Sequence, residues 1–304
     1  MKNFVIYTIM TGGYDNILQP LYVDDRFDYI LFSNDFKEKT IGVWEVRPII
    51  NVVDLSDNKR LSRYPKSHPE ALLSEYDASL YIDANLQIVD NWIYNRVVEL
   101  YNANIEYAGV KLVISGRDCI YDHMLDMCIM GVEHDYNAAR QCHVMLQQGF
   151  PSHFGLNENN IIYRKHTDKM KTADEEWWWW ITNYSFRDQF SYMFCLWKHN
   201  IAINYIFPEG EDSRNSSHIN YIQHDNKKTT KRIVKKGFFE YLRNRSCSYN
   251  TELYYSQWKD LCKNEDYSKQ LVLWGAKISF FNIHKIIGEI LYRVIRKTMK
   301  IINF

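Results

Sequence analysis

Two polar residues directly after a short apolar segment at 78–82 have the types and spacing for metal chemistry. Asp83 and Asn85 stand one residue apart in the order Leu-Tyr-Ile-Asp-Ala-Asn. In an open α/β sheet, ligands bind at the edge where the parallel strands end. A carboxylate and an amide oxygen at that edge can hold a hard divalent cation, which in turn bridges a diphosphate. The alternative is a plain turn, because Asp and Asn also end strands without binding anything.

A basic helical face is expected just before this strand. Its residues recur at intervals of three or four and are Lys59, Arg60, Arg63 and Lys66. Side chains at this spacing share one face of a helix. Because Arg and Lys pair with phosphate oxygens, the face could clamp a diphosphate. The alternative is a solvated helix surface.

The first apolar segment of the chain ends in a turn that could receive a nucleotide. The candidate residues for binding that nucleotide are Thr8, Thr11, Gly12, Tyr14 and Asp15. Glycine lets the backbone approach a ligand closely, and the Asp15 carboxylate could accept a hydrogen bond from a base or a ribose. The turn has neither the G-x-G-x-x-G pattern nor the Walker pattern, so a Rossmann dinucleotide site and a P-loop are not expected.

A second polar group, Arg187-Asp188-Gln189, follows four consecutive tryptophans at 177–180. Four consecutive residues cannot share one buried helical face, so at least one tryptophan should be exposed to a cleft or a partner. An exposed indole is a platform for a sugar ring, although most of these rings could instead fill the core. Asp188, with Arg187 beside it, is the candidate for orienting an acceptor hydroxyl or acting as a general base.

The elements that must position these residues follow from the apolar pattern. Strands are expected at 3–10, 28–33, 44–49 and 78–83, followed later by a loop and a strand within 154–168 and a strand at 200–210. Helical segments separate them: one begins near Ser56 and breaks at Pro65, a short one enters through Pro69, and further helices are expected at 117–150 and 175–200. Alternating strands and helices predict an α/β domain with a central mixed sheet.

Charge divides the 304-residue chain unevenly. Residues 227–304 carry 17 Lys and Arg against 6 Asp and Glu, whereas the first 226 residues have a net charge of −11. We therefore expect a catalytic domain at 1–226 and a basic, mainly helical appendage at 227–304 whose partner is anionic. Nucleic acid is not expected, because the acidic body would repel it and no RRM, KH or zinc-finger pattern is present.

The segment from Ile283 to Phe304 has an amphipathic pattern. Its polar face carries five basic residues and one acidic residue, and its other face is apolar. Such a helix can lie in the interface of an anionic bilayer. The alternative is packing against the catalytic domain or a second subunit. Since no run of 18 apolar residues occurs, a spanning helix is not expected; we expect a cytoplasmic protein, peripheral at the inner face of the membrane.

Four ordered strings resemble a glycosyltransferase-like family of bacterial surface-polysaccharide gene clusters and plant Golgi cell-wall proteins. They are K-R-x-S-R-Y-P-K-x-H-P at 59–69, Y-D-A-S-L-Y-I-D-A-N at 76–85, R-D-C-I-Y-D at 117–122 and R-D-Q-F-S-Y at 187–192. The resemblance covers roughly residues 1–225. It implies a GT-A fold in which an Asp-x-Asp-like motif holds Mn²⁺ or Mg²⁺ on the diphosphate of a nucleotide sugar.

On this resemblance Asp83 and Asn85 become the metal motif, and the basic face at 59–66 lies near the donor phosphates. Residues 187–189 fall in the donor or acceptor pocket, and His224, or alternatively His218, is the third metal ligand. The implied activity is sugar transfer from a nucleoside diphosphate, with UDP favoured, to a saccharide or lipid-linked saccharide in capsule or O-antigen synthesis. Two departures stand out: Asn85 leaves one charged metal ligand, and His123 replaces an expected acid. A non-catalytic carbohydrate-binding or scaffold protein is the alternative.

Overall fold

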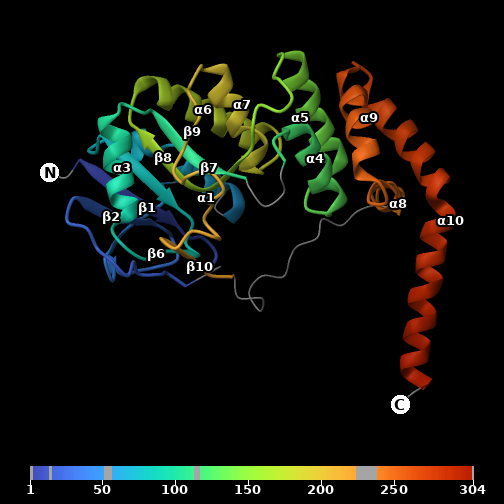
Figure 1. The fold of residues 1–304 in the computed structure, drawn as a ribbon, viewed down its shortest axis with the longest axis horizontal. Coiled ribbons are helices and arrows are strands. Elements are labelled where there is room, and N and C mark those ends of the chain that lie inside the picture. The colour runs from blue at the N-terminus through green and yellow to red at the C-terminus, as the bar shows by residue number, and fades with distance from the viewer. Residues whose placement is uncertain (1–2, 14–15, 51–56, 113–116, 224–237, 303–304) are drawn as a thin grey trace. The chain divides into compact units, whose positions relative to one another are not determined.

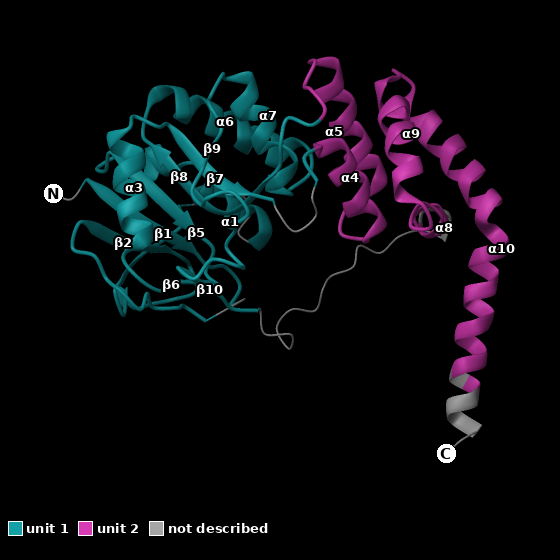
Figure 2. Ribbon diagram, viewed as in Figure 1, with its two compact units in different colours: residues 1–118, 153–231 teal, residues 119–152, 232–304 magenta. Residues whose placement is uncertain are grey.

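The computed structural model describes residues 3–13, 16–50, 57–112, 117–223 and 238–302 (Figure 1). The chain divides into two compact units (Figure 2): residues 1–118 with 153–231 form unit 1, and residues 119–152 with 232–304 form unit 2. The expected boundary at 226 lies near the break at 231. Residues 119–152, which were expected in the first domain, belong instead to unit 2, because their two helices pack against its C-terminal helices.

Unit 1 is built on a mixed eight-stranded sheet with the order β3-β4-β2-β1-β5-β8-β7-β9. Strands β4, β2, β1 and β5 are parallel, and β8 runs antiparallel between β5 and β7. The strand bounds are β1 Phe4–Ile9, β2 Phe27–Phe32, β3 Thr40–Ile41, β4 Trp44–Arg47, β5 Ala78–Ile82, β7 Tyr107–Lys111, β8 Asn157–Lys165 and β9 Asn204–Tyr205. The expected α/β class with a mixed sheet is confirmed.

The strands expected at 3–10, 28–33 and 78–83 are confirmed as β1, β2 and β5. The strand expected at 200–210 is reduced to the two residues of β9. Its pairing with β7 extends one residue further, where the Ile206 N–H donates to Gly109 O at 2.9 Å. Pro208, which has no N–H to donate, follows two residues later.

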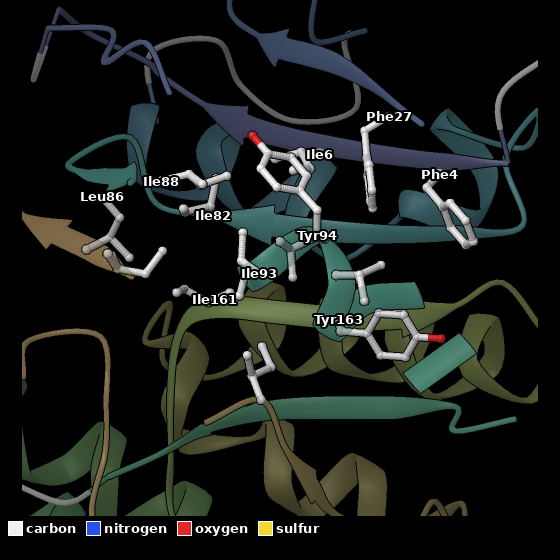
Figure 3. Close-up of a cluster of buried hydrophobic side chains, with 14 of the residues drawn as sticks. Phe4, Ile6, Phe27, Ile82, Leu86, Ile88, Ile93, Tyr94, Ile161 and Tyr163 are labelled. Atoms are coloured by element: carbon white, nitrogen blue, oxygen red, sulfur yellow. The ribbon is translucent and has the colours of Figure 1, made fainter. Parts of the chain in front are cut away.

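Helices cover both faces of this sheet. Helix α3 (Trp92–Asn102) packs its apolar side on the face that carries Ile6 and Tyr163, and these residues belong to one hydrophobic core (Figure 3). Side chains alternate along a strand, so Arg164, next to Tyr163, points to the opposite face. There its guanidinium pairs with Asp174 of α6 (Asp168–Asn183), and both side chains are fully buried.

Helix α1 (Asn58–Lys66) carries the basic residues and begins at an N-cap. The Asp57 side chain accepts a hydrogen bond from the Arg60 N–H at 3.1 Å. Pro65 was expected to break the helix; it lies in the last turn, and the helix ends one residue later. Helix α2 (Pro69–Leu72) enters through Pro69 as expected, and η1 (Asp188–Phe190) and α7 (Tyr192–Lys198) follow α6.

The topology brings three distant segments to one edge of the sheet. Parallel strands β1 and β5 both end there, and antiparallel β8 begins there. The Asp83 N–H donates to Asn160 O at 2.8 Å, which joins the end of β5 to the start of β8. A two-stranded sheet of β6 (Leu86–Ile88) and β10 (Ile219–Tyr221) follows this edge.

Unit 2 contains α4 (Ile120–Ile129), α5 (Asp135–Gln147), α8 (Phe238–Cys247), α9 (Thr251–Lys263) and α10 (Tyr267–Ile302). The expected helix from Ile283 is the second half of α10. Its last buried side chain among the described residues is Ile286, and Ile287, Ile290 and Leu291 are exposed. No helix in the described part of the chain is both long and apolar enough to cross a bilayer.

Candidate functional site

Two adjoining cavities open at the shared sheet edge of unit 1, one of about 380 Å³ and one of about 240 Å³. Both are lined by Arg63, Asp83, Asn85 and Phe186. The first cavity also contains Met10, Thr11, Asn58, Lys59, Ser62 and Tyr81 in its lining. The second is more polar and adds Lys66, Glu158, Asn159, Asn160, Arg187, Asp188, Gln189, Arg214 and Tyr221.

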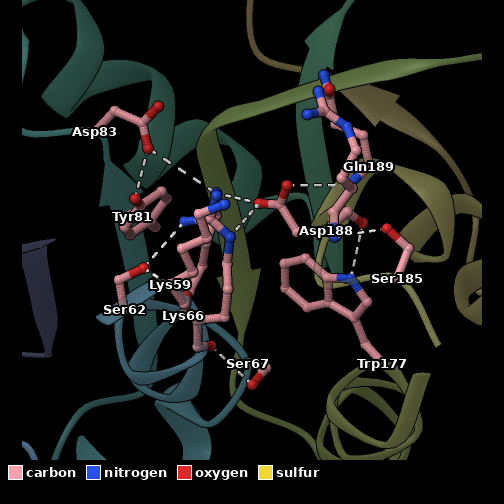
Figure 4. Close-up of polar contacts among 12 residues, drawn as sticks. Lys59, Ser62, Lys66, Ser67, Tyr81, Asp83, Trp177, Ser185, Asp188 and Gln189 are labelled. Atoms are coloured by element: carbon pink, nitrogen blue, oxygen red, sulfur yellow. Dashed lines mark hydrogen bonds and ion pairs between the residues drawn. The ribbon is translucent and has the colours of Figure 1, made fainter. Parts of the chain in front are cut away.

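A buried ammonium group lies between two carboxylates at the centre of this site (Figure 4). Lys66 Nζ donates to Asp188 Oδ2 at 2.7 Å and lies 3.9 Å from Asp83 Oδ1. It also lies 4.5 Å from the centre of the Tyr81 ring. Burial lowers the pKa of Lys66, while the charges of the two carboxylates oppose that shift. The helix end and the two partners together hold this positive charge in one place.

Asp188 is the anchor for the basic residues of α1. Its Oδ2 also lies 3.5 Å from Arg63 Nε, and its Oδ1 accepts the Gln189 N–H at 3.0 Å. Burial alone would raise the pKa of Asp188, but the charges of Arg63 and Lys66 outweigh it and hold that pKa well below its usual range. The carboxylate is therefore a weak base. Trp177 Nε1, at 2.9 Å from Asp188 O, fixes the backbone of η1.

Asp83 and Asn85 lie in both cavities but in different surroundings. Asp83 Oδ1 accepts the Tyr81 hydroxyl, and about a third of its side chain is exposed. Asn85 is nearly buried, and its Nδ2 donates to Ile222 O at 3.0 Å. Burial, with a further contribution from the Asp83 charge, raises the pKa of Tyr81, so its hydroxyl stays a proton donor to Asp83.

The donor set for a divalent cation here is small. Within the described ranges, no group of three or more His, Cys, Asp and Glu side chains is placed to hold a metal ion. Asp83 and Asn85 offer one carboxylate and one amide, and Lys66 already lies close to Asp83. Mg²⁺ is often held by one or two carboxylates together with water and substrate phosphates. Asp83 and Asn85 would therefore hold a hard cation only together with water and ligand oxygens.

The four basic residues of α1 have two kinds of surroundings: some line a cavity, and one is bonded to other parts of unit 1. Lys59 Nζ lies 4.2 Å above the Phe186 ring and lines the first cavity, and Arg63 lines both. Arg60, in contrast, is held by the scaffold: its Nη1 pairs with Asp57 at 2.8 Å and its Nε donates to Ile181 O at 3.3 Å. Three of the four basic residues thus line a cavity.

The segment after β1 contributes Met10 and Thr11 to the first cavity. Thr11 lines it, and its hydroxyl donates to Asn58 O at 3.0 Å. Gly12 has a φ of +74°, and a Cβ there would lie 2.8 Å from Asn58 Nδ2. Thr8 is buried within β1 and lines neither cavity.

Three candidate residues, Tyr14, Asp15 and His224, lie outside the described residues. His218, the alternative third metal ligand, is engaged elsewhere in unit 1. Its Nδ1 lies 2.8 Å from Asp90 Oδ2, and its ring stacks on Trp92 with the centroids 4.6 Å apart. His218 lines neither cavity.

The four tryptophans divide as the helical period requires. Trp177 and Trp180 are buried, and Trp179 is 49% exposed, which confirms that one ring reaches solvent. Trp178 packs edge-on against Tyr64, with ring centroids 5.3 Å apart. The aromatic ring that lines both cavities is Phe186, and none of the four tryptophans lines either cavity.

Sequence reasoning missed the start of β8 and the loop that follows β9. Glu158 is buried, pairs with Arg214 and lines the second cavity with Asn159. A signal was present, since four polar residues at 157–160 begin a strand that is otherwise apolar. Polar residues at the start of a strand antiparallel to β5 lie at the same edge as Asp83.

The combined lining is suited to an anionic, hydroxyl-rich ligand. No protein-family model and no curated protein matches this chain. Lys59, Arg63 and Lys66 supply fixed positive charge, and the second cavity supplies both hydrogen-bond donors and acceptors.

Proposed function

We propose that the chain is a GT-A-type glycosyltransferase that uses a nucleoside-diphosphate sugar, with UDP favoured as the nucleotide. One observation carries the proposal: three cations of α1 reach two adjoining cavities at the sheet edge that also holds Asp83 and Asn85. The first cavity would take the nucleotide and its diphosphate, and the second the sugars. The four strings that resemble the surface-polysaccharide family support a saccharide or lipid-linked saccharide acceptor.

The basic residues would act on the leaving group. When the bond between sugar and phosphate breaks, negative charge grows on the departing diphosphate. Cations fixed before the reaction stabilise that charge more in the transition state than in the ground state. Lys66 and Arg63 both pair with Asp188, so neither has to be ordered during the reaction. A Mn²⁺ or Mg²⁺ ion held by Asp83 and Asn85 would add Lewis-acid charge to the same diphosphate.

Release of nucleotide tests the proposal. The purified full chain is incubated with UDP-glucose, UDP-galactose, UDP-N-acetylglucosamine or GDP-mannose, with and without Mn²⁺ or Mg²⁺, and free UDP or GDP is measured. We expect turnover of at least one donor. The alternative, a non-catalytic carbohydrate-binding protein, is favoured by the single charged ligand that the Asp-Ala-Asn motif offers. Sugar binding without nucleotide release would support that alternative.

We also propose that the second half of α10 binds an anionic membrane surface, which would place the enzyme at the inner face of the cytoplasmic membrane. Beyond Ile286 its described apolar side chains are exposed, namely Ile287, Ile290, Leu291, Tyr292, Val294 and Ile295. Arg293 and Arg296 alternate with them, and Lys297 and Lys300 follow in the sequence. Apolar and basic residues interleaved in this way match the acyl chains and anionic headgroups of a bilayer interface.

A further inference from the structure

The second cavity contains buried polar atoms that no protein group satisfies. Among the described residues, Asn159 Nδ2 and Asn160 Oδ1 have no hydrogen-bond partner. Both side chains are more than nine-tenths buried and line the cavity. Leaving such atoms unpaired costs free energy, so one unpaired donor and one unpaired acceptor in the lining favour a ligand that can both accept and donate. A sugar hydroxyl does both.

Glu158 lies beside these two residues on β8 and lines the same cavity. Its Oε1 accepts from the Arg214 guanidinium, and its Oε2 accepts from Asn160 Nδ2 at 2.9 Å. An ionised carboxylate offers about four acceptor positions. The two recorded contacts therefore leave acceptor capacity for a hydroxyl in the cavity.

We propose that the second cavity binds the acceptor saccharide and that Glu158 takes the proton of its attacking hydroxyl. This inference rests on the proposed glycosyltransferase function. The acceptor oxygen forms a bond to the anomeric carbon of the donor sugar, and the bond from that carbon to the phosphate oxygen breaks. The nucleoside diphosphate leaves with the electron pair, and the hydroxyl proton goes to the Glu158 carboxylate. A single displacement of this kind inverts the anomeric configuration.

Glu158 is better suited to this role than the other two carboxylates of the site. Asp188 accepts from Lys66 and Gln189, lies against Arg63, and its pKa is held low, so it is a weak base. Asp83 already receives the Tyr81 hydroxyl and lies 3.9 Å from Lys66. Burial raises the pKa of Glu158, and the hydrogen bond and charge of Arg214 offset this only in part. A carboxylate with a raised pKa is the stronger proton acceptor near neutral pH.

Arg214 is a positioning residue in this arrangement. Its backbone N–H donates to the buried Asp212 carboxylate at 2.8 Å, and its guanidinium lies 5.1 Å from the centre of the Tyr221 ring. The loop thereby fixes the group that orients Glu158. Arg214→Lys keeps the charge and loses the planar fork, so we expect it to retain more transfer activity than Arg214→Gln.

The test compares Glu158→Gln with Asn159→Ala in the full chain. Transfer from the active donor to 4-nitrophenyl monosaccharides is followed across pH, and UDP binding is measured by calorimetry. We expect E158Q to lose roughly 10²-fold or more in transfer, to lose the acidic limb of the pH–rate profile, and to bind UDP within about twofold of the parent. N159A should raise the KM for the acceptor and keep the acidic limb. E158Q preserves the size of the side chain, and its amide oxygen can still accept from Arg214. Retained UDP affinity in this variant would show that the site is folded.

The possible failures are distinct. A parent protein that turns over no donor contradicts the proposed function itself. An active parent whose E158Q variant keeps its transfer rate and its acidic limb contradicts only the role of Glu158, as does a product with retained anomeric configuration. Loss of UDP binding in an E158Q variant that unfolds at the same denaturant concentration as the parent would place Glu158 with the donor and overturn its assignment to the acceptor.

Discussion

At the scale of single residues, Lys66 links the folding of unit 1 to its proposed chemistry. An ammonium group with 2% exposure is costly to bury unless it is paired. Asp188 and Asp83 provide that pairing, and the Tyr81 ring lies against the same group. The charge that would stabilise a departing diphosphate is thus also part of the core beneath the cavities.

Replacing Lys66 with Met should therefore reduce stability. Met keeps the apolar stem but removes the ammonium group that lies 2.7 Å from Asp188, while Arg63 remains at 3.5 Å. Breaking one partner of a buried pair typically costs about 3–5 kcal/mol. Denaturant unfolding of K66M, D188N and the double variant would measure it. We expect the double variant to lose less unfolding free energy than the sum of the losses in the two single variants. A loss equal to that sum would contradict the pairing.

Asp83→Ala tests the proposed metal–diphosphate role. Asp83 is partly exposed and its recorded side-chain partners are Tyr81 and Lys66, so its loss should leave the fold intact. Removing a group that stabilises transition-state charge typically costs on the order of 10²-fold in rate. The measurement is nucleotide release at saturating donor, with Asp83→Asn as the variant that removes charge and keeps size. Turnover by D83A at the parent rate would refute this role.

Glu70 should make stability depend on pH. Burial, with the nearby Asp174 charge adding to it and Arg164 opposing, raises the pKa of Glu70 above its ordinary value of 4.5. As pH rises past 4.5, Glu70 loses its proton in the unfolded chain but keeps it in the folded chain. The free energy of unfolding therefore falls with rising pH until the pH passes the pKa of Glu70 in the folded chain. The slope is at most about 1.4 kcal/mol per pH unit. Glu70→Gln mimics the protonated form and should flatten the slope in melts at several pH values; an unchanged slope would contradict the assignment.

At the scale of elements, the turn after β1 shapes the first cavity through glycine. Gly12 and Gly13 both have positive φ, but a Cβ at Gly12 would meet Asn58 and a Cβ at Gly13 would meet nothing within 4 Å. Alanine should strain the backbone by about 1–2 kcal/mol at either position. G12A must also displace Asn58, which lines the cavity.

We therefore expect G12A to weaken UDP binding on the order of tenfold, or about 1.4 kcal/mol, and G13A to weaken it less. Calorimetric titration of both variants with UDP provides the measurement. Since the two share the backbone strain, the difference between them isolates the contact with Asn58. Equal affinities in G12A and G13A would show that this contact does not shape the nucleotide site.

The elements that the sequence predicts well are those with a local apolar signal. The β-branched and aromatic runs at 4–9 and 78–82 are buried strands, and the amphipathic pattern at 58–66 is a helix. Asp83 and the basic face were found because they follow or form such elements. Glu158 was missed because its role depends on β8 lying antiparallel beside β5, a pairing of segments about 80 residues apart that no local pattern specifies.

At the scale of the whole molecule, each unit has its own buried core. Unit 1 holds both cavities of the candidate site. Unit 2 buries Trp258, Cys142 and Cys262 among its helices, while α10 continues beyond its last described buried residue, Ile286. Beyond Ile286, Glu289 still pairs with Arg245 and Tyr249 of unit 2, but the described apolar side chains of α10 are exposed and add nothing to an apolar core. Its apolar side chains are accounted for if they bind an external surface.

The membrane proposal predicts that the full chain floats with anionic liposomes and that two kinds of substitution release it. Ile290, Leu291 and Ile295 are exposed, so changing all three to Ser should not unfold unit 2. Arg293→Gln with Arg296→Gln removes two charges, each contributing about 1 kcal/mol near an anionic surface. Flotation is measured with phosphatidylserine-containing and with purely zwitterionic vesicles.

We expect the triple Ser variant to lose binding to both kinds of vesicle, because the apolar contact is gone. The double Gln variant should lose binding mainly to the anionic vesicles, and added salt should weaken the parent in the same direction, since exposed charges are screened. Light scattering of the same proteins without lipid addresses the competing explanation. A parent dimer that the Ser variant converts to monomer, with flotation unchanged, would mean that a second copy and not a bilayer covers the exposed face of α10.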